Sequence, residues 1–189
     1  MSLVSRVVGA TAVLALAAGG AAVVAPPASA SRAPACFAPH LRMVRAGTEG
    51  ALSHRYVKFR ITNTGRDACR LYGYPEVSAY RDSPEAGEHV AGGQIGGPAV
   101  RDTSVRPRPV MLEPGATAHA VLRVMVAAST ESAQCTRVTA EELRVALPSQ
   151  GRAAFVPAHI LVCSSKGSVS LSVQAIQARP GVPGYAAMP

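Results

Sequence analysis

A two-residue alternation of apolar and polar side chains recurs along most of this chain and restricts the choice of fold. Alternation of this kind places one set of side chains on each face of a β-strand. The clearest runs lie at 56–62, 117–126, 143–147 and 168–175, with turn-forming residues such as Asn63, Gly65 and Pro148 beside them. About eight or nine short strands separated by turns predict an all-β sandwich.

The remaining segments extend this prediction. Residues 81–109 are rich in Gly, Pro and charge, and they predict a long surface loop or a loosely held hairpin. A short helix is expected within 129–142, where Thr139 precedes Glu141 and Glu142 as a cap. The run at 168–175 predicts a strand with one buried face and one solvated face. Shorter strands are expected at 41–43, 77–80, 110–112, 153–156 and 160–163.

Residues 1–30 have the pattern of a secretory signal peptide. Arg6 supplies a positive charge, an uncharged apolar run follows it, and Ala28-Ser29-Ala30 matches the A-x-A cleavage pattern. We expect the mature chain to begin at Ser31, after export by the general Sec-type route, because no Arg-Arg pair is present. An uncleaved anchor is the alternative, since the run is close to the minimum length for a span, but its Ala, Gly and Val insert weakly.

Four cysteines lie beyond this leader, at Cys36, Cys69, Cys135 and Cys163. An exported chain enters an oxidising compartment, so two disulfides are expected. Three connectivities are possible, and we favour Cys36–Cys69 with Cys135–Cys163, because each pair closes a loop of about 30 residues between neighbouring strands. Lipidation at Cys36 is a second alternative, but the preceding residues lack the Leu of a lipobox and three cysteines would remain.

Three regions follow from these signals. They are a signal peptide at 1–30, a disulfide-bonded β-sandwich at 31–176, and a disordered tail at 177–189 that is rich in Pro, Gly and Ala. The formal net charge is +8. A basic surface fits an anionic cell-wall polymer better than nucleic acid, because nucleic acid is not expected where an exported protein works.

Two groups of residues are candidates for a contact surface. Arg101, Arg106 and Arg108 form the one local concentration of positive charge, and arginine binds phosphate in a bidentate manner. Tyr72 and Tyr74 flank Gly73 and would project to one face of an extended segment. They could form an exposed binding patch, although we expect one of them to pack under the Cys36–Cys69 bridge.

Several segments together resemble a secreted bacterial family, the domain of unknown function numbered 4232. They are Ile61-Thr62-Asn63-Thr64-Gly65, Cys69-Arg70-Leu71-Tyr72-Gly73-Tyr74-Pro75, Val77-Ser78 and Leu112-Glu113-Pro114-Gly115, with Cys135 and Cys163 as the later cysteine pair. The resemblance covers about Cys36 to Ala175. It implies an exported, immunoglobulin-like β-sandwich with disulfides, and it implies no reaction and no functional residues.

No catalytic or metal-binding motif is evident in the sequence. The histidines are His40, His54, His89, His119 and His159, and no two of them have the spacing of metal ligands on one element. His40 with Met43, or His119 with Met125, are the pairs that a copper site would use, but ordinary strand positions explain them.

The sequence therefore predicts a non-catalytic binding module of the cell envelope or exterior, with no cofactor and no stable membrane anchor. Its partner is expected to be an anionic wall polymer or an extracellular protein. Two alternatives from other classes are an exported hydrolase of unfamiliar type and an envelope copper carrier. A deep polar pocket with a His beside a Ser or a carboxylate would favour the hydrolase.

Overall fold

The computed structural model describes residues 33–51, 54–81, 93–125, 135–148, 152–165 and 170–180. The expected signal peptide lies outside these residues. The described chain forms eleven strands and one short 3-10 helix, η1 (Ala38–His40). The strands are β1 (Leu41–Ala51), β2 (His54–Asn63), β3 (Cys69–Leu71), β4 (Glu76–Tyr80), β5 (Gln94–Ile95), β6 (Val100–Asp102), β7 (Val110–Leu112), β8 (Thr117–Met125), β9 (Arg137–Ala146), β10 (Ala153–Cys163) and β11 (Leu171–Gln174).

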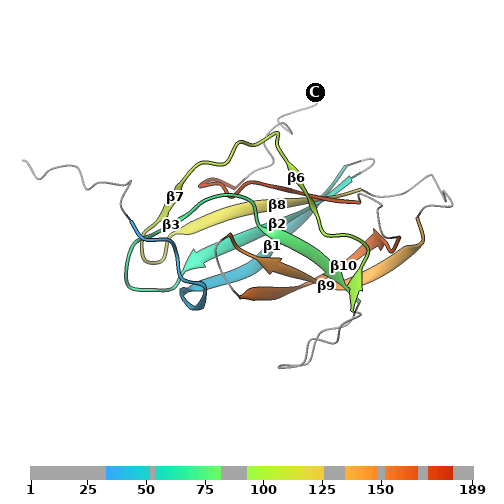
Figure 1. Cartoon of the computed structure of the whole chain (residues 1–189), viewed down its shortest axis with the longest axis horizontal. Coiled ribbons are helices and arrows are strands. Elements are labelled where there is room, and N and C mark those ends of the chain that lie inside the picture. The colour runs from blue at the N-terminus through green and yellow to red at the C-terminus, as the bar shows by residue number, and fades with distance from the viewer. Residues whose placement is uncertain are drawn as a thin grey trace, which may run out of the picture.

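Two sheets face each other, and a smaller one closes one end (Figure 1). The five-stranded sheet has the order β1-β2-β8-β11-β6, and the four-stranded sheet has the order β10-β9-β4-β5. All neighbours in the two sheets are antiparallel except β11 and β6, which run parallel. Strands β3 and β7 form the third, two-stranded sheet. The predicted all-β sandwich is confirmed.

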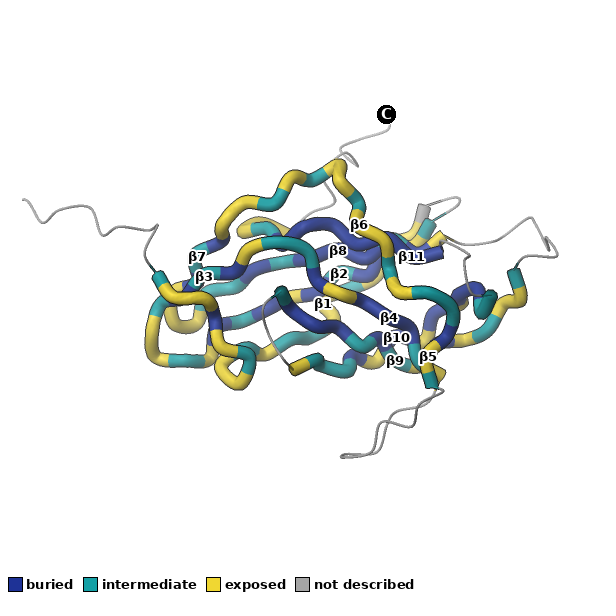
Figure 2. The backbone as a smooth tube through the Cα atoms, in the orientation of Figure 1, coloured by how far each residue is buried: buried dark blue, intermediate teal, exposed yellow. Residues whose placement is uncertain are grey.

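The main core lies between the two large sheets. Its buried side chains come from the inward face of each, with Phe59 and Leu122 on one side and Val77 and Leu143 on the other. A second cluster lies under β3 and β7, where Ile61, Leu71 and Leu112 surround the Cys36–Cys69 bridge. Figure 2 shows the buried backbone along the central strands and the exposed backbone in the connecting loops.

Both favoured disulfides are present. Cys36 bonds to Cys69 and Cys135 bonds to Cys163, with sequence separations of 33 and 28 residues. The first bridge fixes the segment before η1 to the start of β3, and two backbone hydrogen bonds between residues 34–36 and Arg70 support it. In the chain-entropy description, bridges that close loops of this length each stabilise the fold by about 3–4 kcal/mol.

Four sequence-based expectations need correction. The prediction of a short helix within 129–142 is wrong for the described part of that range, because residues 137–142 belong to β9. This strand is paired on both sides, by β10 and β4, and these pairings override the local capping signal of Thr139. The buried positions of β9 also change phase between Ala140 and Leu143, so the alternation that marks a strand is interrupted there.

The other three corrections concern β10, β11 and the long loop. The two strands expected at 153–156 and 160–163 are one strand, which bulges between Pro157 and Ile160. All four residues of β11 are buried, so the expected solvated face is wrong. The segment 81–109 contains β5 and β6, although residues 82–92 lie outside the described part of the chain.

The outer strands of the two sheets meet along one side of the sandwich. Strand β1 is at the edge of one sheet and β10 is at the edge of the other. The Arg45 guanidinium donates a hydrogen bond to the Ala158 carbonyl, with an Nη1–O distance of 2.9 Å. Pro157 and the bulge at His159, whose φ is 48°, interrupt the free edge of β10. Such features protect an exposed edge from pairing with another chain.

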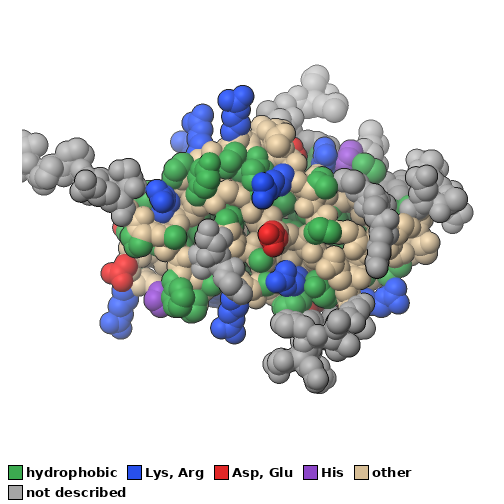
Figure 3. Space-filling view, viewed as in Figure 1, with side chains coloured by type: hydrophobic (Ala, Val, Ile, Leu, Met, Phe, Trp, Pro, Cys, Tyr) green, Lys and Arg blue, Asp and Glu red, His purple; other side chains and the backbone are tan. Residues whose placement is uncertain are grey.

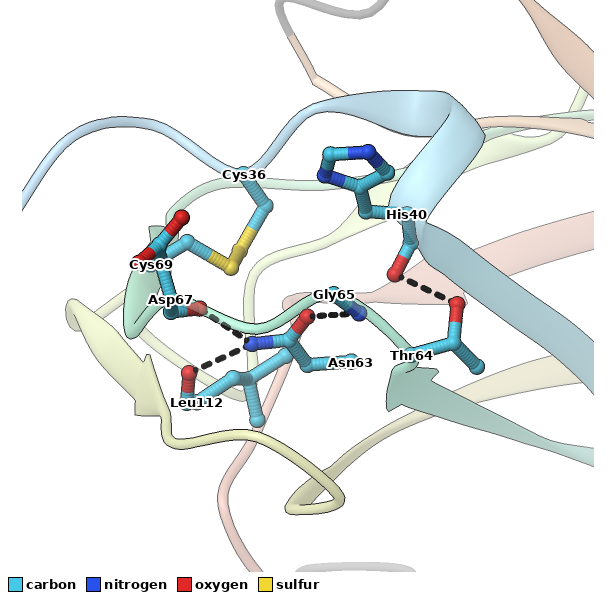
Figure 4. Close-up of a disulfide and its surroundings, with 8 residues drawn as sticks. All are labelled: Cys36, His40, Asn63, Thr64, Gly65, Asp67, Cys69 and Leu112. Carbon is cyan, nitrogen blue, oxygen red and sulfur yellow. Dashed lines mark hydrogen bonds between the residues drawn. A yellow bond between two sulfur atoms is a disulfide. The ribbon is translucent and has the colours of Figure 1, made fainter.

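Asn63 is a buried hydrogen-bonding centre beside the first disulfide (Figure 4). Its Nδ2 donates to the carbonyls of Asp67 and Leu112, at 2.8 and 2.9 Å, and its Oδ1 accepts from the Gly65 amide. A Cβ at Gly65 would lie 3.1 Å from both this Oδ1 and the His40 Cβ, so the close approach favours glycine. The side chain therefore joins the turn after β2 to the end of β7.

We predict that Asn63→Ala lowers the free energy of unfolding by about 2–4 kcal/mol, because the buried Leu112 carbonyl and two partly buried backbone groups lose their partner. Thr64→Val is the matched control. This substitution removes the hydrogen bond from the exposed Thr64 hydroxyl to the His40 carbonyl. The carbonyl keeps a partner in the variant, because the Thr64 backbone amide donates to the same oxygen. The expected cost of Thr64→Val is below about 1 kcal/mol. Urea unfolding measures both, and equal losses would contradict this assignment.

Candidate functional site

The three candidate arginines lie on one stretch of exposed backbone. Arg101 is in β6, and Arg106 and Arg108 are in the connection from β6 to β7. All three side chains are exposed. Lys and Arg side chains project along the upper rim of the molecule in Figure 3, over the place that this connection occupies in Figure 1. The structure thus presents the predicted concentration of charge to solvent.

Local sequence limits the conformation of this connection. Arg106 and Arg108 each precede a proline, in the order Arg106-Pro107-Arg108-Pro109. Proline fixes its own φ near −65°, and it also biases the residue before it toward an extended conformation. The two prolines therefore favour extended backbone at both arginines before any ligand binds. Less conformational entropy is lost when a chain of this kind binds.

Tyr74 connects the tyrosine and arginine candidates. Its hydroxyl donates a hydrogen bond to the Val105 carbonyl at 3.0 Å. The Arg101 guanidinium carbon lies 5.6 Å from the centroid of the same ring, within the range of a cation–π interaction. Tyr74 thus contacts both β6 and the connection that follows it. The sequence proposed both groups but did not predict that they meet.

Tyr72 is placed differently from Tyr74. Gly73 has a φ of 109°, a left-handed value that turns the chain between the two tyrosines, so the extended geometry expected there is not present. The Tyr72 side chain is 55% exposed, whereas Tyr74 is partly buried. Neither tyrosine is a member of the apolar cluster around the Cys36–Cys69 bridge, so packing of a tyrosine under that bridge stays a prediction.

A hollow of about 580 Å³ lies beside the arginines. It opens where β6 and β11 stop pairing, and the connection after β6 forms one wall while residues 176–178 form the other. We call it the Arg106 hollow. Its lining residues are Ser104, Val105, Arg106, Arg108, Pro109, Val110, Ile176, Gln177 and Ala178. None of them is acidic, so the hollow combines two cations with a hydroxyl, an amide and apolar surface.

A small polar cluster adjoins the hollow through Ser104. The Ser104 amide donates to the Asp102 carboxylate at 3.0 Å, and the Gln174 amide group reaches the Ser104 hydroxyl at 3.4 Å. Partial burial raises the pKa of Asp102, but the Ser104 hydrogen bonds, the charge of Arg123 and the Gln174 amide together lower it below its ordinary value. Asp102 is thus a carboxylate that holds the start of the connection in place.

The described histidines lie on separate elements of the fold. His40 ends η1, His54 begins β2, His119 is in β8 and His159 is in the β10 bulge, while His89 lies outside the described residues. Within the described ranges, no three His, Cys, Asp or Glu side chains are grouped so that they could hold a metal ion. No helix in that part of the chain is long and apolar enough to cross a membrane.

These features define a disulfide-bonded β-sandwich with a basic hollow at one edge. The chain belongs to the family described as a domain of unknown function, DUF4232, which matches residues 36–177. The resemblance drawn from the sequence is thus confirmed. No curated protein and no solved structure matches the chain. The match reaches Gln177, whose amide and carbonyl both bond to His119, so ordered backbone continues into the segment expected to be a tail.

His119 provides a test of the packing next to the hollow. Burial lowers the pKa of the His119 imidazole, and the charge of Arg60 on the neighbouring strand lowers it further. The unfolded chain therefore binds a proton more readily than the folded protein as the pH falls below about 6.5. We predict that the free energy of unfolding decreases from that pH downward, until the folded-state pKa is reached, and that it is unaffected by this group at higher pH.

Urea unfolding of the protein and of His119→Gln across pH 4.5–8 measures this effect. In His119→Gln, the free energy of unfolding should no longer show the decrease below about pH 6.5 that His119 causes. Arg60→Gln serves as the control, because it removes the smaller cause and leaves burial, so it should retain most of the dependence. An unchanged pH profile in His119→Gln would contradict the assignment.

Proposed function

We propose that this protein is a non-catalytic binding module that works outside the cytoplasm and contacts an anionic cell-wall polymer. The surface formed by Arg101, Arg106 and Arg108 makes the contact. The observation that carries the proposal is the placement of three exposed arginines on β6 and on the connection that follows it, both of which Tyr74 contacts. Exposed guanidinium groups on a conformationally restricted backbone favour a ligand that carries phosphate.

The absence of local neutralisation supports this reading. Lys58 of β2 forms an ion pair with Glu49 of β1, and no such pair is found at Arg101, Arg106 or Arg108 within the described residues. Arg101, Arg106 and Arg108 therefore have no carboxylate within 4.0 Å in that part of the chain. An anionic ligand would meet these charges without displacing a carboxylate of the described residues.

Export supports the proposed location. The leader has the charge, apolar run and cleavage pattern of a signal peptide, and the domain after it holds two disulfides. Disulfides persist in oxidising compartments and are uncommon in a reducing cytosol. The same compartment contains the wall polymers to which a basic surface would bind.

Co-sedimentation of purified residues 31–189 with isolated cell walls tests the proposal. We predict that the protein is retained at low salt and released at high salt, because screening weakens contacts between exposed charges. Replacing Arg101, Arg106 and Arg108 with Ala should weaken retention at least tenfold, since each arginine near an anionic surface contributes about 1 kcal/mol.

The matched control replaces three other exposed arginines, Arg42, Arg66 and Arg137, with Ala. This variant has the same net charge as the first one, so it should keep most of the retention if location matters. Equal losses in the two triple variants would show that net charge alone causes binding. Unchanged retention in the first variant would remove the arginine surface from the proposal.

A further inference from the structure

We infer that the Arg106 hollow is a binding site for a phosphate ester of a small hydroxylated chain. This inference rests on the proposed function and identifies the chemical unit of the polymer that enters the protein. Arg106 and Arg108 would bind the phosphate, while Ser104 and Gln177 would bind the neighbouring hydroxyl groups. Residues from two separate parts of the chain, 104–110 and 176–178, line the hollow.

Both walls of the hollow are fixed by hydrogen bonds to other segments of the fold. On one wall, the Ile176 amide bonds to the Gly73 carbonyl at 2.9 Å, and Gln177 exchanges two backbone hydrogen bonds of 2.8 Å with His119. On the other wall, Tyr74 holds the Val105 carbonyl and Asp102 holds the Ser104 amide. The space between the walls is therefore a fixed feature of the fold, since each wall has its own hydrogen-bond partners elsewhere.

The lining selects for an ester rather than for a bare anion. Two exposed guanidinium groups supply the charge-assisted donors that a phosphate accepts. The Ser104 hydroxyl and the Gln177 amide can each both donate and accept, which suits hydroxyl groups. Val105, Pro109 and Ala178 provide apolar surface for the carbon atoms between them. Inorganic phosphate alone would use only the first of these three features.

The extended Arg106–Arg108 backbone also suits a repeating ligand. The two Cα atoms are roughly 7 Å apart when two residues are extended, so the guanidinium groups can bind one phosphate together or two successive phosphates. The hollow is open to solvent on the side of the exposed arginines. A polymer can therefore continue beyond the hollow toward Arg101, which connects this site to the larger arginine surface.

The test is a titration of purified residues 31–189 with glycerol 3-phosphate, followed through backbone amide NMR shifts. We expect the largest shifts at Ser104, Val105, Arg106, Gln177 and Ala178. Inorganic phosphate should bind at least several-fold more weakly, and glycerol alone should cause no shifts. Shifts that are spread over other basic surfaces, or equal affinity for phosphate and its ester, would overturn the inference.

Two variants assign the site. Arg108→Ala should weaken binding of the ester roughly tenfold, since hydrogen bonds to charged groups are the stronger ones. Ala178→Glu leaves both arginines in place but adds a carboxylate to the exposed rim, and it should weaken binding by at least as much. Arg137→Ala, on β9 of the other sheet, changes the net charge equally and should leave binding unchanged. If Arg108→Ala and Ala178→Glu bind the ester as tightly as the unchanged protein does, the assignment of the site to this hollow is wrong.

The outcomes separate this inference from the proposed function. If cell walls retain the protein through its arginines but glycerol 3-phosphate does not bind, the hollow is not the site, although the arginine surface stands. If the ester binds in the hollow but walls do not retain the protein, the site stands and the wall partner is wrong. Retention on phosphatidylglycerol vesicles without binding of the soluble ester would also overturn the inference, because a lipid surface would then be the ligand.

Discussion

The buried amide of Asn63 holds together the end of the sandwich on which the rest of the structure depends. It joins the turn after β2 to the end of β7, and its backbone bonds to Gly115 and Ala116 in the following turn. The Cys36–Cys69 bridge lies beside it (Figure 4). A buried amide with all its partners specifies one arrangement, because any other would leave polar groups without hydrogen bonds.

That end of the sandwich positions the candidate site. The connection with Arg106 and Arg108 leads directly into β7, which pairs with β3, and Cys69 begins β3. The other end of the connection leaves β6, which pairs with β11. Tyr74 follows β3 and reaches the middle of the connection at Val105. The arginines are therefore carried by a segment that is fixed at both ends and in the middle, which is what a preformed binding surface requires.

Much of the fold could be predicted from sequence, because strands such as β2 alternate buried apolar residues with more exposed polar ones. Prediction failed where a strand does not meet that condition. Strand β11 is buried on both faces, since Arg123 donates to Ser172 and Ser104 meets Gln174 on its outer face. Ser172 and Gln174, which read as part of a solvated face, are in fact buried and each contacts a polar side chain of a neighbouring segment, while the Gln174 Oε1 has no hydrogen-bond partner among the described residues. Their identity alone does not reveal those contacts.

The candidate site was predictable only in part. The arginines form a visible cluster in the sequence, but the contact between Tyr74 and Val105 joins residues 31 positions apart. The hollow depends on the divergence of β6 from β11, which are 70 or more residues apart and pair in parallel. Such a pairing has no local signal, because it is set by the topology of the whole sheet. Two of the residues that complete the hollow, Gln177 and Ala178, lie within the segment that composition alone assigns to a tail.

The most direct test of a preformed site is ¹⁵N relaxation of the amides of Ser104, Val105, Arg106 and Arg108 in the free protein. A segment held by Tyr74, Asp102 and two strands should have order parameters of about 0.85, equal to those of β2 and β8. Values below about 0.6 would mean that the arginines move freely before binding. That result would contradict a fixed hollow and leave only a flexible basic loop.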